Sequence, residues 1–471
     1  MNYKKHILST AVTACLLLPQ ISFATNGAFS HGFGTKNKSM AGAGVASPQS
    51  AFASALNPAG LAFVEQQWDL GLELFAPRRG YSANPTTNGN VNGSGSTSLI
   101  DSKNGWFPIP SFAFNWKMDN KNSLGLALYG NGGMNTEYDP GDTFGGLGTL
   151  PFRDPTNTVQ SSGTVGINLE QLFINASFAH KISQHTSLGV SAIVAVQRLN
   201  AKGLTAFMPL AEKASAAGAA SNFTNGGTDT AYGVGFKIGY QGIISKSTAF
   251  AASYQSEVSM GGHDKYANFL PGDMNIPATA SIGITTNMSK TSSISIDVQH
   301  IAYSDVEAYG NKVEPFLNNC AFPRSAILTA NAQGDFSKTI VTDPGTNCVG
   351  SENGPGFGWN DMTVYKIGYQ IQSSPETTWR FGISRGNQPI DSSQIMFNVL
   401  APATVENHFT FGFTEKMNKG EFNLGVMYAP KKSITGTNPF DSTQTVTIEM
   451  NQFAFEGSWS SQIGRASCRE R

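Results

Sequence analysis

The sequence has 471 residues and a formal net charge of −1, and charged residues make up only 13% of it. Soluble domains usually contain roughly 25% charged residues, so this composition is unusual for one. The nearly balanced charge gives no sign of the basic excess typical of nucleic-acid-binding proteins, and no nucleic-acid partner is expected. The histidines show no spacing typical of a metal site, and neither a metal nor a cofactor is expected.

The sequence pattern of residues 1–24 is typical of a secretory signal peptide. A basic start and an apolar run over 7–18 are followed by small residues at positions 22 and 24, which suit cleavage after Ala24. A lipoprotein signal ending at Cys15 is the alternative, but it would leave three leucines directly after the modified residue. The chain is therefore predicted to be exported.

Residues 25–66 are rich in small residues and weakly charged, unlike the sequence that follows them. Ser47 and Pro48 suit the N-cap and first position of a short helix. Asn57-Pro58 suits its end, because the residue before a proline avoids the helical region. We interpret this segment as a plug that lies inside a β-barrel.

From residue 67 to residue 460 the sequence repeats a run of about ten residues with alternating polarity, a turn and a second such run. In one run, Leu188 and Val190 alternate with Gly189 and Ser191. Runs of this length match strands that cross a bilayer at a tilt, whereas strands of soluble sandwiches are nearer 5–6 residues long. About fourteen strand cores are predicted, at 67–78, 106–118, 122–134, 165–181, 186–200, 229–243, 247–258, 274–287, 291–304, 360–373, 376–387, 402–417, 420–431 and 444–459.

The predicted connections alternate in length. Tight turns such as 119–121 and 183–185 alternate with long connections such as 305–359 and 432–443. Short turns at one end and long loops at the other are typical of outer-membrane barrels, and no apolar run after Ala24 is long enough for a membrane helix. The predicted fold class is all-β: a 14-stranded antiparallel transmembrane β-barrel with an N-terminal plug in its lumen.

One long loop contains a segment, 204–220, that is rich in Ala, Leu and Met and predicts short helical pieces with an apolar face. An exposed apolar surface outside the membrane is typical of a capture site for an apolar ligand. Phe207, Met208 and Leu210 are the candidate residues. The alternative is a helix that packs over the barrel mouth.

Cys320 and Cys348 lie in one loop of a chain that is predicted to be exported. An oxidising compartment favours a disulfide between them. Such a bridge typically contributes about 2–4 kcal/mol to stability. Two free thiols are the alternative.

Several short motifs occur in a defined order along the chain. They are Gly32-Phe33-Gly34, Met40-Ala41-Gly42-Ala43-Gly44, Asn57-Pro58-Ala59 and, in the third predicted strand, Tyr129-Gly130-Asn131-Gly132-Gly133-Met134-Asn135. With this order and spacing the chain resembles the FadL/TodX family of outer-membrane transporters for long-chain fatty acids and aromatic hydrocarbons. The resemblance covers essentially the whole mature chain.

The resemblance implies a monomeric barrel whose plug fills the lumen and whose third strand kinks inward, opening a hole in the wall. It implies that a ligand lands on an outer hydrophobic groove, passes to a pocket near the plug and leaves sideways into the bilayer when the plug moves. The site residues implied are Asn57, Pro58 and Ala59 in the plug and Gly130, Gly132 and Gly133 at the opening. Glycines suit a kink because they tolerate bulges, although a simple strand end is the alternative.

The predicted function is passive uptake of hydrophobic compounds, such as long-chain fatty acids, across the outer membrane of a Gram-negative bacterium. The predicted partners are the ligand and the lipid and lipopolysaccharide around the barrel. Lys366 and Arg380 are predicted to face the lumen, where they could meet a carboxylate head group. Their alternatives are solvation in the lumen or pairing with Asp297.

Two other functions are considered. A general porin would carry more charge around a constriction and would lack a plug. An outer-membrane lipase is suggested by residues 382–386, which match G-x-S-x-G at Ser384, with His408 as the nearest candidate base. That motif needs a strand, a sharp turn and a helix, and the sequence after Gly386 is not helical, so the protein is not expected to be an enzyme.

The predicted organisation is therefore a signal peptide (1–24), a plug (25–66), a transmembrane barrel (67–460) and a tail (461–471). The tail is basic and not strand-like. It resembles translated sequencing-adapter sequence, and we expect it to be non-native.

Overall fold

The computed structural model describes residues 26–84, 98–139, 164–211, 222–321 and 347–462. The predicted signal peptide lies outside the described residues, as does the predicted tail from residue 463 onward. None of the helices among the described residues has the length and hydropathy needed to span a membrane.

The described chain is built on one antiparallel sheet of 16 strands, of which β2 (Ile100–Asp101) and β9 (Ser259–Met260) have two residues each. The remaining fourteen are long, and each pairs with its neighbours in chain order. They are β1 (Gln67–Ala83), β3 (Phe107–Lys117), β4 (Asn122–Asn135), β5 (Gly166–Lys181), β6 (Thr186–Lys202), β7 (Asp229–Ile243), β8 (Thr248–Gln255), β10 (Thr279–Asn287), β11 (Ser292–Ile301), β12 (Met362–Gln372), β13 (Thr377–Gly386), β14 (Asn407–Met417), β15 (Gly420–Asn438) and β16 (Asp441–Gln462).

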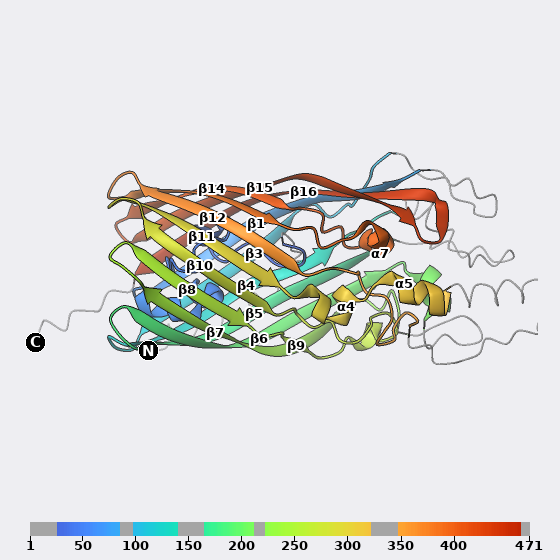
Figure 1. The fold of residues 1–471 in the computed structure, drawn as a ribbon, viewed down its shortest axis with the longest axis horizontal. Helices are drawn as coiled ribbons and strands as arrows, with labels where there is room; N and C mark the ends of the chain where they lie inside the picture. Colours follow the sequence, from blue (N-terminus) through green and yellow to red (C-terminus); the bar gives the residue numbers. More distant parts are fainter. Residues whose placement is uncertain (1–25, 85–97, 140–163, 212–221, 322–346, 463–471) are drawn as a thin grey trace, which may run out of the picture.

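The sheet closes into a barrel because β16 pairs with β1, from Gln67 opposite Gln462 to Ala83 opposite Val446. Short turns gather at one end of the barrel, and the helices α4 (Glu307–Gly310), α5 (Val313–Phe316) and α7 (Ile395–Asn398) lie at the other (Figure 1). The predicted 14-stranded antiparallel barrel is confirmed.

The long connection predicted at 432–443 is wrong, and β16 continues two residues past the predicted end of the barrel at 460. Ser433 to Thr437 continue β15 and pair with residues of β16, and only a short turn follows Asn438. Beyond Ala429 the β15 arm of the hairpin is mostly polar, so the alternation that marks a membrane strand fades there although the backbone pairing continues. On the β16 arm, Val446 and Ile448 are buried in the cluster of the outer loops.

The two faces of the wall differ in polarity, as the period of two in a strand requires. Large apolar side chains face outward and are exposed, among them Leu70, Leu72, Val190, Val234, Phe236 and Ile238. The lumen side carries buried polar side chains, among them Asn115, Asn175, Ser177, Ser191 and Gln241. An apolar outer band suits contact with lipid, and the polar inner face suits contact with the plug.

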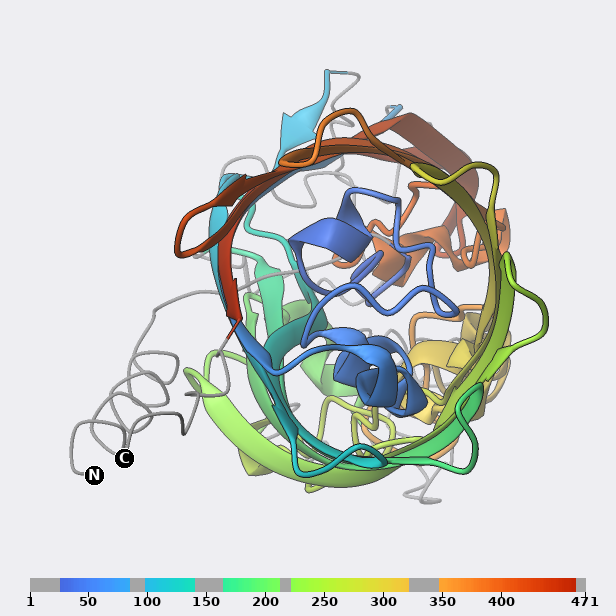
Figure 2. The same ribbon diagram turned by 90° about the vertical axis from the view of Figure 1, so that its left-hand side faces the viewer.

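The N-terminal segment fills the inside of the ring (Figure 2). It contains α2 (Thr35–Lys38), α3 (Ala53–Leu56) and the 3₁₀ helix η1 (Pro58–Phe63). The short helix predicted from Ser47 begins only at Ala53. Small residues allow close approach: Gly42 has φ +78°, and a Cβ atom there would overlap the carbonyl of His31.

Shorter helices fold the long loops over the open end. They are η2 (Thr205–Leu210), η3 (Asp264–Tyr266), η4 (Tyr303–Asp305), the π-helix η5 (Leu317–Ala321) and η6 (Ser392–Gln394), in addition to α4, α5 and α7. Their aromatic side chains form a buried cluster in which Tyr303 and Tyr309 pack on Trp359, with ring centroids 5.0 and 5.5 Å away.

Candidate functional site

The hydrogen-bonded wall is interrupted between β3 and β4. β3 pairs with β1 along the whole stretch from Asn115 to Phe107. Its pairing with β4 covers only Lys117 to Phe112, and the described residues show no β4 partner for residues 107–111. We call this interruption, between residues 107–111 and 129–135, the β3–β4 break.

β4 remains hydrogen-bonded to β5, its neighbour on the other side. Its register with β5 runs to Asn135, with one shift between Gly130 and Gly132. A register shift of this kind marks a bulge, which bends the strand and changes its direction. Gly130, Gly132 and Gly133, the residues proposed from the resemblance for a wall opening, all lie at or beside this shift.

Two prolines that the sequence reasoning missed lie on the opposite edge of the break. Extending the register of Phe112 and Leu128 would place Pro110 opposite Gly130 and Pro108 opposite Gly132. Proline has no N–H, and alternate residues of a strand direct that group to the same side. The pairing of β3 with β1 continues past both prolines. The N–H groups that the prolines remove are therefore those on the edge of β3 that faces β4. A proline at every second position of a strand is a signal of such an edge.

The plug takes the place of β3 beside β4. Phe29 forms an antiparallel bridge with Gly132, the Ser30 N–H donates to the Asn131 carbonyl at 2.8 Å, and the Gly133 N–H donates to the Ala28 carbonyl at 2.9 Å. A Cβ atom on Gly132 would overlap the Ala28 carbonyl. The start of the plug can therefore approach β4 only because residue 132 is glycine.

The Asn57-Pro58-Ala59 motif fastens the plug to β6 and β7. The Asn57 side-chain amide donates to the Tyr240 carbonyl at 3.0 Å, its oxygen accepts from the Ala59 N–H at 3.1 Å, and the Ala59 carbonyl accepts from Ser187 Oγ at 2.7 Å. Asn57 thereby caps η1, and Pro58 occupies the first position of that helix. This motif docks the plug and does not touch the cavity described below.

Ion pairs and a carboxylate hold the middle of the plug to further strands of the barrel. Lys36 pairs with Glu421, and Lys38 lies between Glu73 and Glu456. One further tie comes from β11, where Asp297 Oδ2 accepts the N–H groups of Gly44 and Val45 at 2.7 and 2.9 Å. The plug is thus tied by charge to β1, β11, β15 and β16, and by backbone pairing to β4.

The structure places Lys366 and Arg380 against the plug. Lys366 Nζ donates to the His31 carbonyl at 3.0 Å. Arg380 donates to Gln49 Oε1 at 2.9 Å and to Thr414 Oγ1 at 2.6 Å. Among the ion pairs of the described residues, none joins Lys366 to Asp297.

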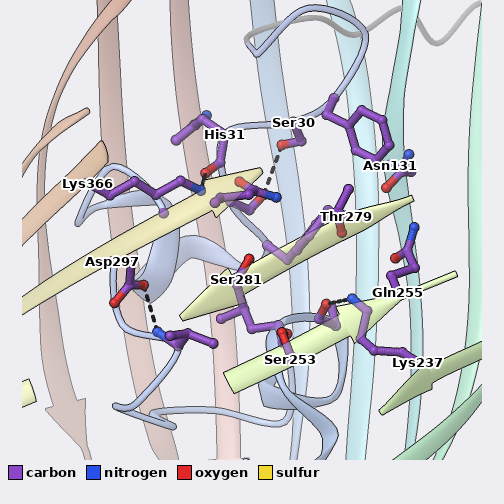
Figure 3. A pocket seen from close by; sticks show the side chains of 18 residues that line it. Ser30, His31, Asn131, Lys237, Ser253, Gln255, Thr279, Ser281, Asp297 and Lys366 are labelled. Carbon is purple, nitrogen blue, oxygen red and sulfur yellow. Dashed lines mark hydrogen bonds between the residues drawn. The ribbon is translucent and has the colours of Figure 1, made fainter. Parts of the chain in front are cut away.

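A small cavity lies between the plug and the wall formed by β7, β8, β10, β11 and β12 (Figure 3). Lys366 lines it from β12, Lys237 from β7 and Asn131 from the β3–β4 break. Arg380 does not line it.

Lys237 is a site residue that the sequence reasoning missed. It is only 4% exposed. Its ammonium donates to the Ala55 carbonyl and lies 5.9 Å from the centre of the Phe33 ring. The sequence does contain a sign of this position: Lys237 lies between Phe236 and Ile238, which face outward, so the alternation of the strand directs Lys237 into the lumen.

The proposed capture residues lie in the outer loops. Phe207 is 6% exposed and packs on Phe397 with ring centroids 5.4 Å apart, and Leu210 is fully buried. Met208 packs against the same cluster and is partly exposed. The apolar side of η2 therefore packs over the barrel mouth in this conformation, and residues 212–221 lie outside the described residues.

The structure pairs Cys320 with Cys348 in a disulfide, with Cα atoms 5.3 Å apart. The bridge connects η5 to the segment whose Val349 N–H donates to the Leu210 carbonyl at 3.1 Å. The disulfide therefore closes a segment of the β11–β12 loop, and this segment contacts η2 of the β6–β7 loop.

Ser384 and His408 are hydrogen-bonded, with Ser384 Oγ 3.2 Å from His408 Nδ1. Both side chains are buried. Ser384 lies inside the continuous strand β13, opposite Lys366 on one side and His408 on the other. A nucleophile elbow requires a sharp turn after the serine, so the match to G-x-S-x-G at Ser384 arises from a regular strand.

Comparisons with known proteins were made for this chain. The solved structure of the Pseudomonas putida toluene transporter TodX is 17% identical, covers 92% of this chain and 99% of its own, and has a TM-score of 0.63. The fold is shared by a Pseudomonas aeruginosa FadL homologue, which is 14% identical, covers 93% of this chain and 100% of its own, and has a TM-score of 0.59. It is also shared by the Ralstonia pickettii toluene transporter TbuX, which is 15% identical, covers 91% of this chain and 99% of its own, and has a TM-score of 0.55. No curated protein matches the chain.

The profile of one family, described as outer membrane protein transport protein (OMPP1/FadL/TodX), matches residues 21–454. The similar structures named above are transporters or their homologues, and no enzyme is among them. The match spans the plug, the β3–β4 break and all strands except the end of β16. The chain belongs to the OMPP1/FadL/TodX family of outer-membrane transport proteins and is not an enzyme.

Proposed function

We propose that this protein takes up hydrophobic compounds passively across the outer membrane and releases them sideways into the bilayer through the β3–β4 break. The observation that carries the proposal is that the wall lacks β3–β4 pairing where the plug supplies residues 28–30 instead. Lateral exit suits an apolar solute because it reaches lipid without crossing water.

The proposed route uses the cavity behind the break. Phe29 and Asn131 belong both to the break and to the cavity lining, so a small movement of the first plug residues would connect the two. The charged ties of Lys36 and Lys38 hold the next part of the plug to β15, β1 and β16. We propose that residues 26–33 move while the remainder of the plug stays anchored.

We propose capture at the outer loops near Met208. Phe207 and Leu210 are buried in this conformation, so a ligand would reach them only after η2 shifts. Two ligand classes are suitable for testing. Toluene is named for the similar structures TodX and TbuX, and long-chain fatty acids are implied by the family resemblance.

The test locks the plug to β4. Ser30→Cys and Asn131→Cys place two cysteines at positions whose backbones are hydrogen-bonded, and each single variant serves as the control for the native disulfide. Uptake of labelled oleate and labelled toluene is measured in cells without another transporter of this kind, before and after reduction. Heat-modifiable migration in gels checks that each barrel has folded.

We expect the oxidised double variant to lose uptake and to regain it on reduction, while both single variants transport throughout. Unchanged uptake in the oxidised double variant would overturn plug movement and exit through the break. If the inserted wild-type barrel takes up neither compound but admits small sugars in liposome swelling, the porin alternative replaces the proposal.

A further inference from the structure

A second pocket lies away from the plug, at the outer ends of β4, β5 and β6, and we call it the rim pocket. Its lining includes four asparagines, two glutamates, one arginine and one lysine, and Ile167 is the one large apolar residue among the described lining residues. Buried polar groups need hydrogen-bond partners. The rim pocket therefore suits a ligand that is rich in hydrogen-bonding groups.

The charged side chains of the rim pocket lie on the lipid-facing side of the wall. Along β6, Arg198 has the same phase as Val190 and Val194, which are exposed on the outer face. The alternate residues Gln197 and Leu199 are buried on the inner face. The Arg198 side chain therefore points away from the lumen.

The rim pocket begins where the apolar band of the wall ends. Leu172 of β5 pairs with Val196 of β6, and the next pair on the same face toward the outer loops is Glu170 with Arg198. Tyr232 of β7 also pairs with Val196 and is 66% exposed. Exposed tyrosines of membrane barrels gather at the membrane interface. Since two residues of a strand span about 7 Å, the Glu170–Arg198 pair lies in the head-group layer of the outer leaflet.

Both cations of the rim pocket have donors beyond those that their acidic partners use. Arg198 Nη1 donates to Glu170 Oε2 at 3.0 Å, and Lys202 Nζ lies 3.5 Å from Glu137 Oε2. A guanidinium has five N–H groups and an ammonium has three. The two basic side chains are each 39% exposed, so their remaining donors are accessible to a ligand from outside.

A chain of hydrogen bonds fixes the floor of the rim pocket. Asn168 Nδ2 donates to Glu170 Oε1 at 2.8 Å, and Asn135 Nδ2 donates to Asn168 Oδ1 at 2.7 Å. Arg79 of β1 donates to the carbonyl and to the side-chain oxygen of Asn135. Asn135 is the last residue of β4. The pocket is therefore preorganised, and its polar floor continues to the outer end of the β3–β4 break.

We propose that the rim pocket binds the head group of lipopolysaccharide, the lipid of the outer leaflet, whose head group is a phosphorylated glucosamine disaccharide. A phosphate contacts Arg198 and Lys202, since a guanidinium fork and an ammonium both bind phosphate oxygens. The sugar hydroxyl and amide groups, which both donate and accept, contact the asparagines and glutamates. The acyl chains lie along the apolar band below, against Leu172 and Val196.

The charge of the rim pocket favours this lipid over a free anion. Its two cations are balanced by two carboxylates, so an inorganic phosphate gains little electrostatic energy there. A phosphorylated sugar also uses the neutral and acidic groups, and its acyl chains remain in the bilayer. The inference is independent of the proposed function, because it concerns the outer face of the wall and not the lumen.

The experiment measures the binding of diphosphoryl lipid A and of phosphatidylglycerol to the purified barrel by native mass spectrometry. The variants are Arg198→Gln and Lys202→Gln, singly and together. Arg78→Gln is the matched control, because Arg78 is also an exposed basic residue of the wall but does not line the rim pocket. Heat-modifiable migration checks that each variant has folded, and an excess of inorganic phosphate is added as a competitor.

We expect the wild type to bind diphosphoryl lipid A about tenfold or more tightly than phosphatidylglycerol, as additional charge-assisted contacts provide. Each single variant should reduce this preference, and the double variant should abolish it. Arg78→Gln should retain the wild-type preference. Inorganic phosphate should not displace lipid A.

Equal binding of the two lipids by the wild type would show only unspecific lipid contact and would overturn the inference. The same loss in Arg78→Gln as in the double variant would show that any basic residue of the wall suffices, and would overturn it as well. Displacement of lipid A by inorganic phosphate would make the pocket a site for free anions. Since uptake is not measured, a failure of the proposed function would leave these outcomes unchanged.

Discussion

Phe29 of the plug and Gly132 of β4 form an antiparallel bridge, which makes the plug the strand partner that β3 does not provide. This pairing lies at the register shift between Gly130 and Gly132. Plug position and wall continuity are therefore coupled: if the plug leaves, residues 129–135 of β4 lose the partner that they have on the β3 side among the described residues.

Replacing Gly132 with alanine should displace the first residues of the plug. The added Cβ would overlap the Ala28 carbonyl, and overpacking of this kind typically costs about 1–3 kcal/mol. We expect faster hydrogen exchange in residues 26–33. Gly457→Ala is the control, because no atom lies within 4 Å of an added Cβ there. Equal exchange in the two variants would contradict the close approach at Gly132.

Replacing Pro108 and Pro110 with threonine should reduce uptake. Each change restores an N–H on the edge of β3 that faces β4, and two hydrogen bonds of about 1 kcal/mol each would shift an open–closed equilibrium by more than about tenfold. Initial uptake rates provide the measurement, and Pro375→Thr in an exposed turn is the control. Wild-type rates in the double variant would show that the prolines do not keep the break unpaired.

Lys38→Met should loosen the plug. It leaves Glu73 and Glu456 buried without the cation between them, and breaking a buried ion pair from one side typically costs about 3–5 kcal/mol. Thermal unfolding and exchange of the plug amides measure the effect. Adding Glu73→Gln and Glu456→Gln to Lys38→Met should recover most of the lost stability, since no unpaired charge then remains. If stability is not recovered, charge pairing is not what anchors α2.

Replacing Cys320 and Cys348 with alanine should destabilise the outer loops selectively. Loss of a disulfide typically costs about 2–4 kcal/mol, and this one closes the segment of the β11–β12 loop that contacts η2. Limited proteolysis should become faster at the outer loops while the heat-modifiable shift of the barrel is retained. Equal proteolysis of wild type and variant would show that the other loop contacts suffice.

Much of the fold could be predicted because a strand in a membrane encodes its environment locally. Leu188 and Val190 face lipid while Gly189 and Ser191 face the plug, and this period of two is visible in the sequence. The outer part of β15 beyond Ala429 was missed because its residues are mostly polar and lack the alternation of a membrane strand, although the paired β16 residues Val446 and Ile448 are buried in the cluster of the outer loops.

The candidate site could be predicted only in part. Gly130 to Gly133 stand out by composition. Lys237, in contrast, cannot be distinguished from other lysines that face the lumen until the position of the plug is known. Lys366 and Arg380 looked equivalent in sequence, but only Lys366 lines the cavity. For Phe207 and Leu210 the sequence left exposure and packing over the barrel mouth as alternatives, because a loop segment does not reveal what covers it.

The sequence by itself determined the alternation of polar and apolar residues, the number of strands and the small-residue segment that fits inside them, since these are properties of neighbouring residues. Only the tertiary structure decided where β4 leaves β3, which lysines have acidic partners and which side chains share a cavity. Such partners lie far apart in the chain, as Lys36 and Glu421 do at a separation of 385 residues, and meet only because the closed barrel places them around one plug.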